Sequence, residues 1–263
     1  MSRIADKLAA LRAEKRKVLI IYITAGAPDM ATTLAAVQAA EQAGADIIEL
    51  GIPFSDPMAD GPVIQKAAML SLKSGTNMAK IAALVREIRQ HSDIPLAAMA
   101  YMNSILNFGE EAFATSFREA GLDGLIIPDL PSEEAAEMDE ICQRNGLDLI
   151  QFIAPTTNVA RISQVCRNAR GFIYCISTTG VTGVRKVDYS GIGRVMNEVR
   201  KHTDVPLAIG FGIGTPEAAK AAAQYADAVI VGSAVMQNLM DEGVPSVRVL
   251  VQSIRQALDE RMK

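Results

Sequence analysis

Residues 43–50 read AGADIIEL, which places a glycine-containing helix end directly before an apolar strand. Glycine fits the left-handed residue that ends many helices. The junction returns as AGLD at residues 120–123 and as NGLD at residues 145–148, with a degenerate copy, YAD, at residues 225–227. A helix-to-strand junction that recurs along one chain indicates alternating strands and helices, and so a parallel sheet.

Working outward from these junctions, short apolar runs alternate with longer segments of helical periodicity. Most of the runs are apolar at successive positions, as is typical of strands covered on both faces. The expected strands are 18–23, 46–50, 95–100, 124–127, 147–152, 171–176, 206–209 and 228–231. The expected helices include 30–43, 81–90, 110–120, 132–144 and 216–224. Eight such units predict an α/β chain folded as a (β/α)8 TIM barrel, with residues 1–263 forming a single domain.

Composition narrows the class of protein. Hydrophobic residues make up 49% and charged residues 21%, which favours a folded core, and the net charge of −4 comes from mixed charges without a basic stripe. Ile4, Leu8 and Leu11 have the spacing of one helix face, and charges interrupt them. They predict an extra N-terminal helix rather than a signal peptide. The three cysteines show no CxxC spacing. We expect a cytoplasmic protein with neither nucleic acid nor membrane as a partner.

A second repeat bears on where chemistry can take place. Residues 89–96 read RQHSDIPL and residues 200–207 read RKHTDVPL, and both lead into expected strands. Active sites of this fold lie at the carboxyl ends of the strands. His91 and His202, the two histidines of the chain, precede strands and so belong to the opposite rim. We therefore expect neither histidine catalysis nor a metal site, and interpret both as cations at helix C-termini.

Glu49 interrupts an apolar strand near its carboxyl end. Side chains alternate along a strand, so Glu49 shares a face with Ile47, whereas Ile48 and Leu50 point the other way. If that face is the barrel interior, Glu49 is a carboxyl group in a largely apolar cavity. Desolvation would then raise its pKa toward the range that suits proton transfer. The alternative is a structural carboxylate paired with a neighbouring donor.

Asp56 and Asp60 follow in a loop rich in proline and glycine. Each of the two aspartates can be explained either by a structural role or by a functional one. Asp56 precedes Pro57 and suits a turn. Asp60 flanks Pro62, which suits the first position of a helix. Spacing alone leaves both readings open.

Two glycine-rich loops follow the expected seventh and eighth strands, GFGIGTPE at residues 210–217 and VGSA at residues 231–234. Thr215 suits a helix N-cap with Pro216 at the first helical position. Helix N-termini bind anions, and these two loops form the common phosphate site of the fold. Neither loop contains Lys or Arg, so backbone amides and Ser233 would bind the phosphate. The alternative is a pair of simple tight turns.

The long segment after the sixth strand, residues 177–188, lacks helical periodicity and is either a lid or a surface connection. Several types of catalysis are disfavoured because the residues that they require are missing. No expected strand ends in lysine, which disfavours a Schiff-base aldolase, and no GxSxG motif is present. No cluster at the rim has metal-ligand spacing. What remains is cofactor-free acid–base chemistry by carboxyl groups on a phosphorylated substrate.

At this point the residues resemble a known family. Residues 49–62, ELGIPFSDPMADGP, are similar to the signature segment of tryptophan synthase alpha subunits. The resemblance continues through residues 22–28, 101–107, 128–131, 180–183, 210–214 and 232–233. It implies a carbon–carbon lyase of aromatic amino-acid biosynthesis. Such an enzyme cleaves indole-3-glycerol phosphate into indole and glyceraldehyde 3-phosphate, and the indole passes to a beta subunit for L-tryptophan synthesis.

The resemblance also implies roles for individual residues. Glu49 resembles the general acid and base, and Asp60 the second catalytic carboxylate. The positions that match the substrate and phosphate site are Tyr22, Tyr174, Thr182, Gly183, Phe211, Gly212, Ile213, Gly232 and Ser233. Two positions depart from the family pattern. Position 22 is often Phe, and Thr178 stands where some members carry Arg, which puts a lid contact by that cation in doubt.

A partner and its docking surface are implied as well. The family works with a pyridoxal-phosphate-dependent beta subunit, so we expect an alpha2–beta2 tetramer with no cofactor on this chain. The positions that match the docking surface are Pro53, Asp56, Asn103, Asn107 and Pro131. Other phosphate-binding barrels remain alternatives, such as an epimerase, an isomerase or indole-glycerol-phosphate synthase, although the synthase would require catalytic lysines at the rim. A catalytically dead barrel that only activates a partner is the alternative from another class.

Overall fold

The computed structural model of the chain describes residues 2–176 and 189–260. Within these residues, eight parallel strands close into one barrel in the order β1 to β8, and β8 pairs with β1. This confirms the predicted (β/α)8 barrel, and the strand ends lie close to the expected ones. The strands are β1 (Val18–Thr24), β2 (Ile47–Gly51), β3 (Leu96–Met99), β4 (Gly124–Ile126), β5 (Asp148–Ile153), β6 (Ile173–Ile176), β7 (Leu207–Gly210) and β8 (Ala228–Val231).

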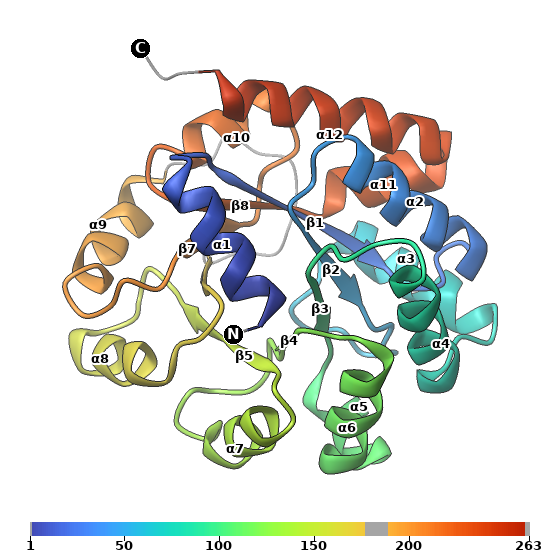
Figure 1. The fold of residues 1–263 in the computed structure, drawn as a ribbon, viewed down its shortest axis with the longest axis horizontal. Coiled ribbons are helices and arrows are strands. Elements are labelled where there is room, and N and C mark those ends of the chain that lie inside the picture. Colours follow the sequence, from blue (N-terminus) through green and yellow to red (C-terminus); the bar gives the residue numbers. More distant parts are fainter. Residues whose placement is uncertain (1, 177–188, 261–263) are drawn as a thin grey trace.

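Helices surround the barrel, and the expected helices are present (Figure 1). One begins later than predicted, at Ala136 instead of residue 132, because the Glu134 N–H donates to the Pro131 carbonyl in a turn. The helices are α1 (Arg3–Ala13), α2 (Met30–Gln42), α3 (Pro62–Lys73), α4 (Met78–Arg89), α5 (Met102–Phe108), α6 (Glu110–Ala120), α7 (Ala136–Arg144), α8 (Val159–Asn168), α9 (Ser190–Val199), α10 (Pro216–Ala222), α11 (Ser233–Glu242) and α12 (Val244–Asp259). Among the described residues, no helix is both long and apolar enough to cross a membrane.

The repeated junction has a structural role at the N-terminal ends of the strands. Its glycines, Gly44, Gly121 and Gly146, all have positive φ, as the sequence predicted. Three of its four aspartates join neighbouring strands, because their carboxylates accept the backbone N–H of a residue in the preceding strand at 2.9 Å. The pairs are Asp46 with Leu19, Asp123 with Leu96 and Asp227 with Leu207.

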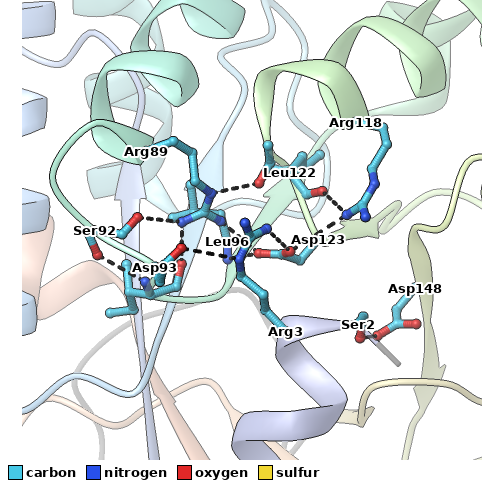
Figure 2. A network of polar contacts seen from close by, with 12 residues as sticks. Ser2, Arg3, Arg89, Ser92, Asp93, Leu96, Arg118, Leu122, Asp123 and Asp148 are labelled. Carbon is cyan, nitrogen blue, oxygen red and sulfur yellow. Dashed lines mark hydrogen bonds and ion pairs between the residues drawn. The ribbon is translucent and has the colours of Figure 1, made fainter.

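Asp123 is the centre of the polar network drawn in Figure 2. Its side chain is fully buried, and its carboxylate lies 2.7 Å from Arg89 and 3.0 Å from Arg3. Arg3 belongs to α1, and Ser2 just before it donates a hydrogen bond to Asp148 at the start of β5. These contacts tie the N-terminal helix to the N-terminal rim of the barrel.

The apolar core has two layers. One lies between the barrel and the outer helices, and the other fills the barrel interior with inward-facing residues such as Ile20, Ile47 and Ile150. The predicted N-terminal helix, α1, lies across the ring of strands in Figure 1. It buries Ile4, Leu8 and Leu11 against the interior layer and closes that end of the barrel. The barrel interior is therefore open at the carboxyl ends of the strands.

Candidate active site

A cavity lies at the carboxyl ends of the strands and spans about 610 Å³, counting the part open to solvent. It brings together nine of the residues that the sequence indicated: Tyr22, Glu49, Asp60, Tyr174, Phe211, Gly212, Ile213, Gly232 and Ser233. Thr178, Thr182 and Gly183, with the segment 177–188, lie outside the described residues. His91 and His202 follow α4 and α9 at the opposite rim, as expected.

Glu49 points into the barrel on the same strand face as Ile47, which belongs to the interior layer. The side chain is only 1% exposed, and its Oε2 has no hydrogen-bond partner. Among residues 2–176 and 189–260, no Lys or Arg forms an ion pair with it. Burial, and then the charge of Asp60, raise the pKa of Glu49 to about 8. The geometry therefore fits a proton donor better than a structural ion pair.

Asp60 comes from the loop between β2 and α3 and is 9% exposed. The loop bends so that the Asp60 N–H donates to the Pro57 carbonyl at 3.1 Å. The Gln65 side chain donates to the Asp60 carbonyl at 2.8 Å. Burial raises the pKa of the Asp60 carboxyl to about 6, against the opposing hydrogen bond of the Tyr101 hydroxyl. Asp60 thus flanks the start of α3 and also lines the cavity.

Two tyrosines lie over glycines at the ends of their strands. The Tyr22 hydroxyl accepts a hydrogen bond from Thr24 Oγ1 at 3.2 Å, and a Cβ at Gly51 would lie only 2.0 Å from it. A Cβ at Gly210 would likewise lie 2.2 Å from the Tyr174 hydroxyl. Any side chain at either glycine would displace a ring from the cavity wall.

Aromatic rings and backbone groups line different parts of the cavity. Tyr174 lies edge-on to Phe211, with ring centroids 6.1 Å apart. Phe211 has φ +79°, a conformation that non-glycine residues rarely adopt and that often marks functional sites. Ser233 begins α11 directly after Gly232, and the first N–H groups of a helix lack partners within it. The cavity therefore offers flat apolar walls, an anion-binding helix end and two carboxyl groups that can exchange protons.

Several site residues escaped the sequence analysis. Met99 and Ile230 line the cavity, and strand alternation from Ala97 and Ala228 could have identified them. Ile64, Gly214 and Ala234 also line it. Tyr101 contacts the Asp60 loop, a placement that no local pattern reveals because it depends on how two loops fold together.

The residues indicated for docking lie at the same rim, Asn103 and Asn107 in helix α5 and the others on loops. Asp56, Asn103, Asn107 and Pro131 are exposed, and so are the apolar side chains of nearby Met58 and Leu106. Pro53 differs, because it is buried within the chain. Asp56 accepts a hydrogen bond from Ser55 and does not line the cavity.

Comparisons with known proteins agree over nearly the whole chain. A family model described as tryptophan synthase alpha chain matches residues 8–261. A tryptophan synthase alpha chain from Synechococcus elongatus is 45% identical over 262 residues, which cover 99% of this chain and 98% of the relative. One from Thermoanaerobacter sp. is 44% identical, covering 98% of this chain and 100% of its own.

Solved structures give the same answer. The crystal structure of tryptophan synthase subunit alpha from Legionella pneumophila has a TM-score of 0.91 and 36% identity, covering 98% of this chain and 99% of that one. A chain in a structure of Mycobacterium tuberculosis tryptophan synthase has a TM-score of 0.91 and 35% identity, covering 98% of both chains. The similarity therefore includes the strands, the helices and the rim that carries the cavity.

Proposed function

The chain belongs to the tryptophan synthase alpha chain family, whose members are lyases that cleave indole-3-glycerol phosphate, and we propose that Glu49 and Asp60 catalyse this cleavage. The reaction would take place in the cavity at the barrel rim. The products are indole and glyceraldehyde 3-phosphate. The observation that carries the proposal is the buried Glu49 carboxyl, which has an unpartnered oxygen and shares its cavity with Asp60. Burying a carboxyl group with an unpartnered oxygen costs free energy, so its presence in the cavity favours a chemical role.

The proposed reaction is a retro-aldol cleavage. Protonated Glu49 donates a proton to the indole ring carbon that bears the side chain. Ionised Asp60 stabilises the positive charge that spreads to the ring N–H. Glu49, now ionised, takes the proton from the adjacent hydroxyl as the carbon–carbon bond breaks, and is thereby protonated again. A pKa of about 8 for Glu49 and about 6 for Asp60 gives both groups the required state near neutral pH.

The residues that line the cavity suggest that different parts of its wall bind the indole and the phosphate. We propose that the rings of Tyr22, Tyr174 and Phe211 contact the indole. The backbone of Gly212, Ile213, Gly232 and Ser233 would bind the phosphate, since no Lys or Arg lines the described cavity. Thr182 and Gly183 are proposed to complete the phosphate site. The proposed chemistry needs no metal and no cofactor on this chain.

The test is the release of indole from indole-3-glycerol phosphate by the purified chain. We expect Glu49→Gln and Asp60→Asn each to reduce turnover by roughly 10²–10⁴-fold, the usual range for general acid–base catalysis. Asp93→Asn is the matched control, because Asp93 is an exposed carboxylate at the opposite rim. Turnover close to that of the unchanged chain in either test variant would remove that residue from the mechanism.

Members of the family work with a beta subunit, and we propose the same partner here, in an alpha2–beta2 tetramer in the cytoplasm. The exposed Asp56, Asn103, Asn107 and Pro131 would contact it. Pro53, which is buried in the chain alone, belongs to the same loop as Asp56. An added beta subunit should raise the rate of cleavage. In that experiment the rate is measured as release of glyceraldehyde 3-phosphate, because the partner consumes indole. No product with or without the beta subunit would favour a barrel that lacks catalysis.

A further inference from the structure

We propose that Tyr101 is a positioning residue that fixes the loop between β2 and α3, so that the Asp60 carboxyl is presented to the cavity. The inference rests on the proposed function, in which Asp60 stabilises charge on the substrate. Tyr101 itself does not line the cavity, so it would act through Asp60 and not on the substrate. Its ring and its hydroxyl make separate contacts with the loop.

The loop needs such a support because its middle is open to solvent. Ser55, Asp56 and Met58 are exposed, and Met58 is 87% exposed. A loop of this kind is expected to be mobile unless contacts from outside hold its two limbs. Tyr101, which is only 3% exposed, contacts both limbs.

On the first limb, the Tyr101 ring stacks on Phe54, with centroids 5.2 Å apart and planes inclined by 27°. On the second limb, the Ala59 N–H donates a hydrogen bond to the Tyr101 hydroxyl oxygen at 3.0 Å. Because that oxygen accepts from Ala59, its single proton remains to be donated. The neighbouring Asp60 carboxyl can receive it, and this hydroxyl lowers the pKa of Asp60 against the effect of burial. The same hydroxyl therefore binds the backbone just before Asp60 and also acts on the charge of its carboxyl.

Tyr101 is well placed to act as a support because its own backbone is fixed. It lies between β3 and α5, where the Ala100 N–H donates to the Ile126 carbonyl at 2.9 Å. The Met102 N–H donates to Asp129 in the β4–α7 loop, also at 2.9 Å. Loop residues positioned from rigid elements hold a catalytic geometry better than residues supported by loops alone.

Removing the hydroxyl should have a specific result. In Tyr101→Phe the stack on Phe54 remains, whereas Asp60 loses a donor that favours its charged form. The pKa of Asp60 should then rise further above its present value of about 6. We expect kcat to fall about tenfold, as for the loss of one charge-assisted hydrogen bond, while KM changes little.

The experiment measures the titration of Asp60 by carbon-13 NMR in the ligand-free protein, together with kcat and KM across pH. Tyr225→Phe is the matched control, since Tyr225 is a partly buried tyrosine at the other end of the barrel, beside Tyr189. Phe54→Leu is the second test variant, because it removes the stack and keeps the hydroxyl. It should move the Asp60 titration in the same direction by a smaller amount.

An upward movement of the Asp60 titration in Tyr101→Phe, absent from Tyr225→Phe, would support the positioning role. An Asp60 titration that stays in place in both Tyr101→Phe and Phe54→Leu would overturn it. Because the NMR measurement needs no substrate, it decides the role of Tyr101 even if Asp60→Asn remains active. In that case the proposed function fails and the contact between Tyr101 and Asp60 is judged separately.

Discussion

At the scale of single residues, burial separates the two carboxyl groups of the cavity. Glu49 is 1% exposed with an unpartnered oxygen, whereas Asp60 is 9% exposed and receives a hydrogen bond from Tyr101. Burial accordingly raises the pKa of Glu49 to about 8 and that of Asp60 to about 6. Between these values Glu49 holds a proton and Asp60 is charged, which are the states that the proposed reaction requires.

The first prediction at this scale concerns the pH dependence of catalysis. A plot of kcat/KM against pH should be bell-shaped, with its maximum between about 6 and about 8. Below this window Asp60 gains a proton and loses its charge, and above it Glu49 loses the proton that it must donate. In Asp60→Asn the limb on the acid side should disappear from the residual rate. A rate that climbs steadily to pH 9 would contradict the assignment of Glu49 as the acid.

The second prediction concerns the stability cost of Glu49. Its folded pKa of about 8 lies above the ordinary value of 4.5, so folding favours the protonated form. The cost to folding is absent below pH 4.5, grows as the pH rises and is complete above about pH 8. Glu49→Gln removes it, and should raise the free energy of unfolding by about a few kcal/mol at pH 8.5 and by much less at pH 5.

Urea unfolding at the two pH values measures this difference. Glu87→Gln is the matched control, because Glu87 is exposed on α4, and it should leave the free energy of unfolding nearly unchanged at both. Equal free energies of unfolding for Glu49→Gln and the unchanged chain at pH 8.5 would show that Glu49 carries no such strain.

At the scale of elements, the repeated aspartates lock the N-terminal ends of adjacent strands. Asp46, Asp123 and Asp227 each accept one backbone N–H of the preceding strand, so the strand pairs β1–β2, β3–β4 and β7–β8 are joined by side chains as well as by their ladders. Arginines neutralise these carboxylates at the rim, as Arg255 does for Asp46 at 3.1 Å. The repeat therefore serves stability at the end of the barrel that lies away from the cavity.

Asp123→Ala tests this device. The variant leaves Arg89, which is 11% exposed, without its partner at 2.7 Å, and also frees the Leu96 N–H. We expect a loss of about 3–5 kcal/mol in the free energy of unfolding, measured with denaturant. Asp93→Ala removes an exposed partner of Arg3 and should cost less than about 0.5 kcal/mol. Similar losses in the two variants would argue against a special role for the buried carboxylate.

At the scale of the whole molecule, the two ends of the barrel have different tasks. Helix α1 closes the N-terminal end, where Ile4 packs beside Gly124 and Gly171. The carboxyl ends of the strands hold the cavity and the exposed loops. Substitutions in the first region should therefore act on stability, whereas those in the second should act on catalysis.

Ile4→Ala tests this division. Ile4 is fully buried, so the truncation should lower the free energy of unfolding by about 2–5 kcal/mol. The rate of indole release, measured well below the unfolding transition, should stay close to that of the unchanged chain. Val249→Ala is the control, since Val249 is 68% exposed on α12 and should cost less than about 0.5 kcal/mol. A loss of kcat in Ile4→Ala while the chain remains folded would mean that the two ends are coupled.

Whether a feature of the structure could be predicted from the sequence depends on how far apart in the chain the interacting residues lie. The strands and Glu49 were predictable because apolar periodicity and side-chain alternation are local properties of a few consecutive residues. The helix start at Pro216, with its Thr215 cap, followed for the same reason. The role of Asp60 remained ambiguous from spacing alone. Its loop has no periodicity, and a position beside the helix start at Pro62 explains the residue as well as a catalytic role does.

By itself, then, the sequence determined the barrel, the strand face that Glu49 shares with Ile47 and the rim at which chemistry can occur. Only the tertiary structure decided that Asp60 is buried beside Glu49, that Pro53 is buried and that Tyr101 supports the loop between β2 and α3. The physical reason is that burial and the pKa values that follow from it depend on groups brought together from distant parts of the chain. Short stretches of sequence carry the pattern of an element, but not the surroundings into which the closed barrel places it.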